Sequence, residues 1–202
     1  MAPTDREIIE RVISGNRRAF AQLVDRHKDK AMTLAMRMLK DREEAEEAVQ
    51  DAFLRAFNAL GRFEWKSSFS TWFYRIVFNV CSTSLSRRGG DLTISLQDET
   101  ENPSTDLRDS DPTPEMDLES AESARIIREE IDLLPASYSS VVTLFFLQEM
   151  SYAEIVDITG MPLGTVKARL FRARTILKKA ILRRTNEKAL VTGVRGIAAA
   201  FL

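Results

Sequence analysis

An acidic stretch that contains prolines, residues 91–122, separates two blocks with helical patterns. Eleven Asp and Glu residues in this stretch accompany a single base, Arg108. Three prolines, Pro103, Pro112 and Pro114, interrupt any long helix there. Because such a composition buries too little apolar surface to offset the entropy of ordering, it predicts a flexible linker between two domains. The linker is either a solvated tether or a polyanion mimic that occupies a nucleic-acid channel.

The two flanking blocks, Arg62 to Arg88 and Leu163 to Lys188, are rich in basic and aromatic residues, although the chain's formal net charge is -1. Attraction to phosphate depends on the local field rather than on the total charge, so each block is able to bind nucleic acid. With 202 residues, 44% of them hydrophobic, the chain can bury one moderate core or two small ones. The change of composition near residue 90 favours two.

The chain has one cysteine, Cys81, and one histidine, His27, which excludes a disulfide framework and a multi-ligand Cys/His zinc site within one copy. We expect no metal, no cofactor and a reducing, cytoplasmic setting. His27 lies among charged residues and is expected at the surface, whereas Cys81 is expected to be a small thiol in the core. No uncharged segment reaches the ~20 residues that span a bilayer, so no stable membrane insertion is expected.

Helical periodicity runs from Asp5 to about Lys40 with a break at residues 14–16, which predicts two helices. Asp41 is expected to cap a third helix, which ends at Gly61 and turns one apolar stripe toward a core. The other side of that helix combines polar residues with one apolar residue: Glu47, Gln50, Asp51 and Leu54. This side is either a docking surface or a solvated acidic face with a peripheral leucine, and periodicity alone does not decide between them.

A loop from Arg62 to Phe69 precedes a fourth helix, opened by Ser70 or Thr71 and continuing to about Arg88. The aromatic residues here are too many for one inward stripe at ~100° per residue, so some are expected to face outward. Outward rings among cations suit single-stranded nucleic acid, because unpaired bases stack on rings while cations hold the phosphates. The alternative is that most of these rings belong to the core. The candidate residues are Arg62, Phe63, Trp65, Lys66, Ser67, Phe69, Trp72, Arg75 and Asn79.

The second block contains a helix-turn-helix pattern. Ser151 and Glu154 have the spacing of a capping box, Gly160 provides a turn, and a long helix follows from Leu163. The second helix of such a motif enters the major groove, where its first side chains reach base edges and later cations hold phosphates. The alternative is that cations simply suit an exposed helix C-terminus. The candidate residues are Thr165, Lys167, Ala168, Arg169, Phe171, Arg172 and Arg174.

Several segments, in this order, resemble bacterial sigma factors of the extracytoplasmic-function (ECF) group, over about residues 5–185. The segments that carry the resemblance are residues 20–24, 43–60, 69–76 with Asn79, Leu134-Pro135, 151–155 and 164–174. The resemblance implies an all-α protein with two small helical domains. It implies a region 2-like domain over residues 1–90, an acidic flexible linker over 91–120, a region 4-like domain over 121–186, and a C-terminal extension of unknown role over 187–202.

The same resemblance implies roles for the candidate residues. The face with Glu47, Gln50, Asp51 and Leu54 would dock on the clamp helices of the largest subunit of RNA polymerase. The loop from Arg62 to Phe69 and the helix with Asn79 would read the non-template strand of the minus-ten element, with one base flipped into a pocket and no need for ATP.

The resemblance further implies that Lys167, Ala168, Phe171 and Arg172 read the minus-thirty-five element in the major groove, with Arg169 and Arg174 nearer phosphates. Core polymerase, through its clamp helices and flap region, promoter DNA and an anti-sigma factor are the implied partners, and no enzymatic activity is implied. Two alternatives stay open. A stand-alone helix-turn-helix regulator would give the aromatic block no role, and a nucleic-acid enzyme would need a catalytic constellation that the sequence lacks.

Overall fold

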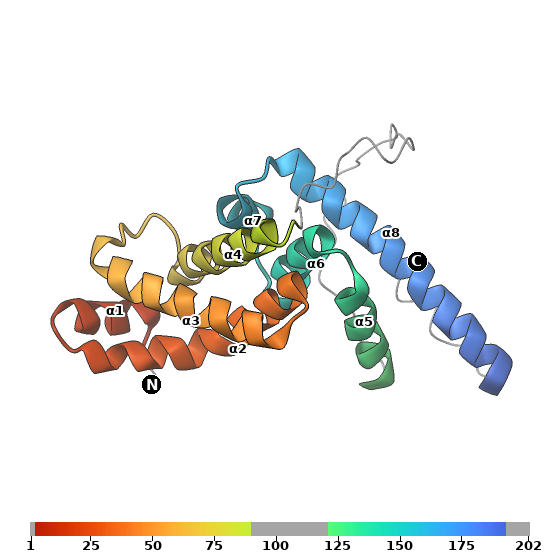
Figure 1. Cartoon of the computed structure of the whole chain (residues 1–202), viewed down its shortest axis with the longest axis horizontal. Coiled ribbons are helices and arrows are strands. Elements are labelled where there is room, and N and C mark those ends of the chain that lie inside the picture. The colour runs from red at the N-terminus through yellow and green to blue at the C-terminus, as the bar shows by residue number, and fades with distance from the viewer. Residues whose placement is uncertain (1–2, 90–120, 193–202) are drawn as a thin grey trace.

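The computed structural model describes residues 3–89 and 121–192, and these residues form eight α-helices and no β-strand (Figure 1). The expected all-α fold is therefore confirmed. The acidic linker expected over residues 91–120 and residues 193–202 of the C-terminal extension lie outside the described residues. No helix in the described part of the chain is long and apolar enough to cross a membrane.

The first block folds into four helices around an apolar core, and the helix ends follow from their capping residues. Thr4 forms a capping box with Glu7, and Asp41 caps the third helix by accepting from the Glu44 backbone N–H at 3.0 Å. The helices are α1 (Asp5–Ile13), α2 (Phe20–Leu39), α3 (Arg42–Ala59) and α4 (Phe69–Arg87), with short 3-10 turns at Arg17–Ala19 and Leu60–Arg62.

The start of α4 differs from the expectation. Ser68, rather than Ser70 or Thr71, is the N-cap, and its Oγ accepts from the Thr71 backbone N–H at 3.0 Å. Thr71 is buried, and its hydroxyl also contacts the Ser68 hydroxyl at 2.8 Å. Three hydroxyl residues within four positions offer equivalent capping chemistry, so composition alone does not identify the cap.

The second block begins with α5 (Ala121–Leu133) and α6 (Ala136–Val142), which continues into a π-helical turn at Thr143–Leu147. It ends with α7 (Tyr152–Thr159) and α8 (Leu163–Thr192). The capping box of Ser151 and Glu154 is confirmed, and Gly160 closes α7 with a φ of 70°, in the left-handed region that favours glycine. The expected short helix, turn and long helix are thus in place.

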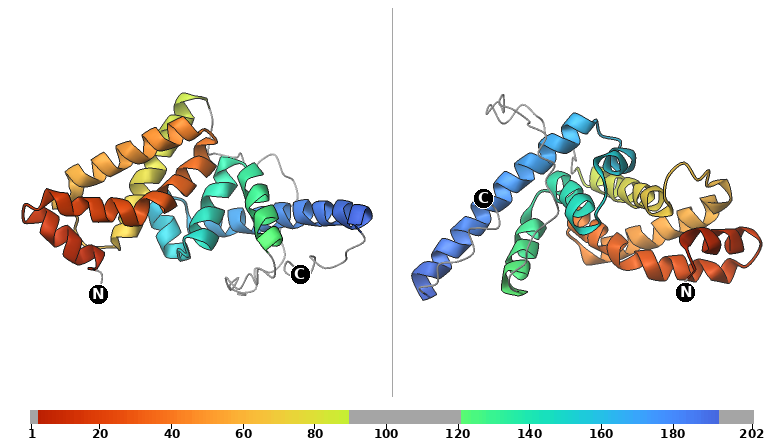
Figure 2. Two further views of the ribbon diagram at one scale, coloured as in Figure 1. Left: turned by 90° about the horizontal axis from the view of Figure 1, so that it is seen from below. Right: turned by 180° about the vertical axis from the view of Figure 1, so that it is seen from behind.

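The two blocks pack against each other, with α4 against α7 and α2 against α6 (Figure 2). Their buried apolar residues form one continuous core. Arg37 of α2 is buried at this interface, where its Nε donates to Asp132 at 2.9 Å and its Nη1 to the Thr143 hydroxyl at 3.2 Å. The Ser139 hydroxyl donates to the Arg37 carbonyl at 2.9 Å. The described protein is therefore closed, an arrangement that the sequence left open.

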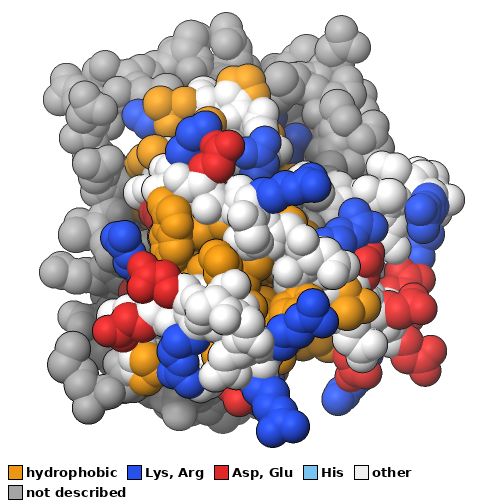
Figure 3. Space-filling view, turned by 90° about the vertical axis from the view of Figure 1, so that its left-hand side faces the viewer, with side chains coloured by type: hydrophobic (Ala, Val, Ile, Leu, Met, Phe, Trp, Pro, Cys, Tyr) orange, Lys and Arg blue, Asp and Glu red, His pale blue; other side chains and the backbone are white. Residues whose placement is uncertain are grey.

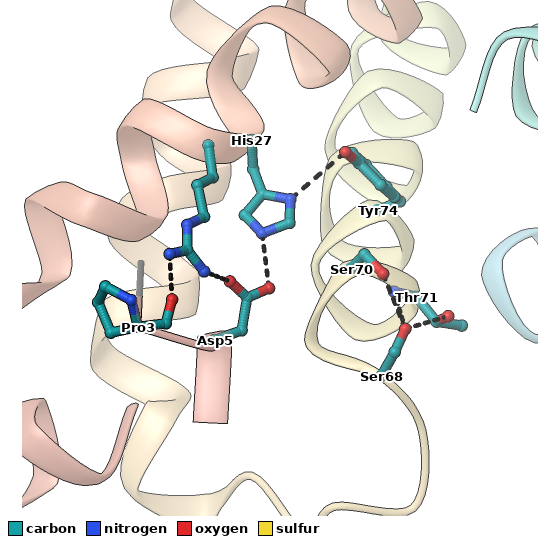
Figure 4. A network of polar contacts seen from close by, with 8 residues as sticks. Pro3, Asp5, His27, Ser68, Ser70, Thr71 and Tyr74 are labelled. Atoms are coloured by element: carbon teal, nitrogen blue, oxygen red, sulfur yellow. Dashed lines mark hydrogen bonds and ion pairs between the residues drawn. The ribbon is translucent and has the colours of Figure 1, made fainter. Parts of the chain in front are cut away.

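His27 is buried, with 8% of its surface exposed, so the expected surface position is wrong. Its Nε2 lies 2.9 Å from an Asp5 carboxylate oxygen and its Nδ1 lies 3.5 Å from the Tyr74 hydroxyl (Figure 4). Arg26 donates to the other Asp5 oxygen at 2.7 Å. This network fastens α1 to α2 and α4. Cys81 is buried as expected, and burial raises its pKa to about 12, so the thiol is unreactive near neutral pH.

Asp5 makes the stability of the first block depend on pH in the acidic range. The bond to His27 lowers the pKa of this carboxyl below its usual 3.8, against the opposing effect of burial. A carboxyl whose pKa is lower in the folded than in the unfolded protein stabilises the fold at pH values above its unfolded pKa. This contribution is lost as the pH falls through the folded pKa. We expect Asp5→Asn to reduce the free energy of unfolding by about 1 to 2 kcal/mol near neutral pH.

The difference between wild type and Asp5→Asn should shrink as the pH falls below about 4, in urea unfolding measured at several pH values. Asp29→Asn, at an exposed position of α2, is the control and should leave the pH profile unchanged. A gap of constant size down to low pH would show that Asp5 acts through packing rather than charge.

Candidate polymerase and nucleic-acid surfaces

The outer side of α3 combines acids with one strongly exposed apolar side chain. Leu54 is 63% exposed, and Glu47 and Gln50 are also exposed, whereas Asp51 is half-buried and pairs with Arg55 at 2.8 Å. The structure thus brings the four predicted residues to one face of α3. A partner that covers this face can bury the apolar surface of Leu54 and pair its own cations with the surrounding acids.

A groove of about 320 Å³ adjoins this face, between α3 and the end of α4. Glu47 and Asp51 line its α3 side, and Thr83, Ser84 and Arg87 line its α4 side. The α4 residues were not predicted to line this site, because nothing in their spacing relates them to α3. Arg87 and Arg88 belong to the basic and aromatic block Arg62 to Arg88, but they lie at the opposite end of the 19-residue α4 from Phe69.

The aromatic block divides into a core and one exposed ring. Trp65 is 42% exposed, as expected for an outward ring, whereas Trp72 is half-buried and packs against the core. The expectation fails for Phe63 and Phe69, which are buried at 8% and 4% exposure. Phe63 instead supports Trp65, with ring centroids 4.8 Å apart, and lies 5.1 Å from Trp72. The buried rings therefore position the exposed ring and do not offer stacking faces themselves.

Trp65 is held in an uncommon backbone conformation, with a φ of 58°. For a bulky residue this is an outlier that costs on the order of 1 to 3 kcal/mol and that persists only where the surroundings enforce it. Lys66 beside it is exposed and pairs with Glu64 at 2.5 Å. Figure 3 shows the end of the molecule that carries α1, where hydrophobic side chains gather near the centre among Lys and Arg side chains.

The remaining candidates on this side lie around the loop and along α4. Arg62, Arg75 and Asn79 are exposed, and Ser67 is half-buried. An exposed ring with cations around it matches the chemistry of a single-stranded nucleic-acid surface.

The helix-turn-helix presents its predicted residues on the outer side of α8. Phe171 is 55% exposed and Arg174 is exposed, whereas Val166, Leu170 and Ala173 are buried and fix the rotation of the helix. The others are partly exposed: Thr165, Lys167, Ala168, Arg169 and Arg172. Lys167 Nζ lies 5.6 Å from the ring of Tyr152 on α7, a contact that the sequence did not predict.

In the closed arrangement a hydrogen bond joins α4 of the first block to the helix-turn-helix. The Thr71 hydroxyl at the start of α4 donates to Glu154 of α7 at 3.0 Å. Burial alone would raise the pKa of Glu154, but the bonds from Ser151 and Thr71 outweigh it and lower the pKa. The helix-turn-helix therefore rests directly on the helix that carries Arg75 and Asn79.

The chain matches two family models in chain order. Residues 23–90 match Sigma-70 region 2, and residues 124–177 match Sigma-70, region 4. The ECF RNA polymerase sigma-E factor of Haemophilus influenzae is 36% identical over 182 residues, covering 88% of this chain and 95% of that protein. The ECF RNA polymerase sigma factor SigW of Bacillus subtilis is 34% identical over 176 residues, covering 86% and 94%.

Solved structures show the same fold. The structure of CnrH in complex with the cytosolic domain of CnrY has a TM-score of 0.59 and 26% identity, covering 89% of this chain and 97% of that chain. The sigma factor RpoE of Bartonella quintana, solved with the anti-sigma factor NepR, has a TM-score of 0.57 and 22% identity, covering 80% and 96%. The order of the two regions, the capped helix-turn-helix and these relatives agree: the chain belongs to the ECF RNA polymerase sigma factors of the sigma-70 family.

Proposed function

We propose that this protein is a promoter-specificity subunit, which binds core RNA polymerase and directs initiation at promoters with minus-thirty-five and minus-ten elements. The observation that carries the proposal is the pairing of an exposed ring, Trp65, on the first block with a helix-turn-helix on the second. A stand-alone regulator needs only the helix-turn-helix, and would give neither Trp65 nor the exposed Leu54 a role.

Within this proposal, residues 1–90 dock on polymerase and read the minus-ten element, while residues 121–186 read the minus-thirty-five element. The face with Glu47, Gln50, Asp51 and Leu54 would contact the clamp helices of the largest subunit, and the second domain would contact the flap region. The protein would act in the cytoplasm, without an enzymatic reaction of its own. Extruding one base costs a few kcal/mol, which stacking at Trp65 and Trp72 and bonds from Asn79 would offset.

Reading both elements requires the closed arrangement to open. Only α7 separates α4 from α8, and packed helices lie about 8 to 10 Å apart. Promoter elements some 25 base pairs apart lie about 85 Å apart along the duplex, at about 3.4 Å per base pair. One closed molecule cannot contact both. We therefore propose that binding to core polymerase separates the two blocks, and that an anti-sigma factor would act by blocking that step.

The proposed function is tested by transcription in vitro with core polymerase on a library of randomised promoters. Initiation that depends on this protein and selects two sequence elements is the expected result. Sequence-specific duplex binding without core polymerase, combined with no binding to core, would instead identify a stand-alone regulator.

Arg172 is the residue of α8 whose removal should affect upstream recognition most directly. If its guanidinium makes a bidentate contact to a base, Arg172→Ala should cost about 1 to 3 kcal/mol and relax selection at one position of the upstream element. Lys179→Ala, further along α8 at an exposed position, should weaken binding uniformly without changing the selected sequence. Promoter selection from the randomised library measures both. An unchanged upstream preference in Arg172→Ala would remove this residue from the reading surface.

A further inference from the structure

Helix α1 brings a cation to the exposed ring, although it lies outside the matched region 2, which begins at residue 23. The Arg6 guanidinium lies 5.2 Å from the centre of the Trp65 ring. Phe63 also contacts this ring, at 4.8 Å between centroids. Trp65 is thus supported by a buried ring and, at the same time, contacted by an exposed cation from a different part of the chain.

The position of Arg6 is fixed by the anchoring of α1. Ile8 and Ile9 on this helix are fully buried, and the capping box at Thr4 fixes its first turn. Asp5, the residue before Arg6, is bonded to Arg26 and His27 at 2.7 and 2.9 Å (Figure 4). A helix anchored at adjacent positions fixes the backbone of Arg6, so the side chain always starts from the same point near Trp65.

The side chain of Arg6 itself is only weakly held. It is 72% exposed and pairs with Glu10, which is 58% exposed, at 3.1 Å. Exposed ion pairs and exposed cation–π contacts each contribute little free energy to holding a side chain in place. A phosphate offers a guanidinium two charge-assisted hydrogen bonds, which are stronger than either of these contacts. Arg6 therefore lies over the ring in this structure and can exchange its present partners, the ring included, for an anion.

A single nucleotide carries the two groups that this arrangement suits, a flat base and a phosphate one sugar away. We propose that Arg6 binds the phosphate of the unpaired nucleotide whose base stacks on Trp65, which makes α1 part of the surface for the minus-ten element. The inference rests on the proposed function and extends it to a residue outside both matched regions. Arg6 acts on the DNA backbone, so it adds affinity and position without reading sequence.

The test uses holoenzyme, formed from core polymerase and the full chain, and a fluorescent single-stranded oligonucleotide with the selected minus-ten sequence. Binding is measured over a series of salt concentrations for wild type, Arg6→Ala, Arg6→Lys and Arg11→Ala. Arg11 is the matched control, because it is a second exposed arginine on α1 and has no contact with Trp65 among the described interactions.

Loss of one phosphate contact to a single strand should lower the salt slope by about 0.7. We expect Arg6→Ala to show this change together with a five- to tenfold loss of affinity, which corresponds to about 1 to 1.4 kcal/mol. Arg6→Lys should keep the salt slope with a smaller loss, and Arg11→Ala should match wild type.

A loss of affinity in Arg6→Ala with an unchanged salt slope would overturn the inference, because Arg6 would then only support the ring. Wild-type affinity in Arg6→Ala would overturn it as well. Failure of the wild-type holoenzyme to bind the oligonucleotide would instead reject the proposed function, and the inference with it. Thermal unfolding of the exposed Arg6 variants should match wild type, which separates these outcomes from misfolding.

Discussion

Replacing Leu54 by glutamate should remove most of the affinity of this protein for core polymerase. The side chain is 63% exposed on the outer side of α3, so the free protein does not need it for packing. Full burial of a leucine by a partner contributes about 1.5 to 3 kcal/mol, and a buried unpaired carboxylate adds a further cost. We therefore expect at least a 30-fold loss, about 2 kcal/mol, in titrations of labelled protein with core polymerase.

Ile13→Glu is the matched control for this change. Ile13 is 53% exposed at the end of α1, so the same substitution there places the same charge on an apolar surface position away from α3. Ile13→Glu should bind core polymerase within twofold of the wild-type affinity, and both variants should unfold at the wild-type temperature. Equal binding by Leu54→Glu and wild type would mean that the outer side of α3 is only a solvated face, the alternative that periodicity left open.

The sequence predicted the helices well where local chemistry determines their ends. Capping residues act on backbone groups within a few residues of themselves, so their roles can be predicted without the rest of the fold. This holds for the N-caps Asp41 and Ser151 with Glu154, and for the C-cap Gly160. The helix-turn-helix followed from them. Family resemblance then added the functional assignments that periodicity left open, such as the docking role of the face with Leu54.

His27 was misjudged although a usable signal was present. Its neighbours in sequence are charged, which suggested the surface, but it follows Phe20 and Leu23 and precedes Ala31 at the three- to four-residue spacing of the buried stripe of α2. Helical spacing is the better guide, because a helix buries a face and not a sequence segment. The partner that satisfies the ring, Asp5, is on another helix and is not predictable from that spacing.

The burial of Phe63 and Phe69 had no such signal. An aromatic cluster in a loop and a first helical turn has no period that separates inward from outward rings. Only the packing of α1, α2 and α4 around the loop decides that Trp65 is exposed and its neighbours are not. The contact between Arg6 and Trp65 could not be predicted either, because it joins positions that are distant in sequence.

Arg37 is a buried charge at the interface of the two blocks, so its counter-ion Asp132 gives a direct test of opening. The Arg37 side chain is 8% exposed and pairs with Asp132, whose side chain is 59% exposed. Asp132→Asn leaves a buried guanidinium without its carboxylate, and the cost of that charge is relieved only when the two blocks separate and water reaches it. The substitution should therefore shift the population from closed to open.

Loss of a fully buried counter-ion costs about 3 to 5 kcal/mol, but Asp132 is partly solvated. We therefore expect the equilibrium between the closed and open forms to shift tenfold toward the open form, which is about 1.4 kcal/mol. Small-angle scattering should report a larger radius of gyration, and amides of α4 and α7 should exchange faster. Asp25→Asn, which breaks an exposed pair with Lys28 at 2.9 Å, is the control and should leave both unchanged.

Opening of the two blocks by Asp132→Asn should also change the affinity of this protein for core polymerase. A protein that is closed before binding must use part of its binding energy to separate its blocks, so its apparent affinity is reduced by the fraction that is open. The variant should bind core polymerase more tightly than wild type, by up to the same tenfold. If Asp132→Asn expands the molecule without tighter binding, then separation of the blocks is not coupled to polymerase. An unchanged scattering profile would show that apolar contacts hold the closed form without the Arg37 pair.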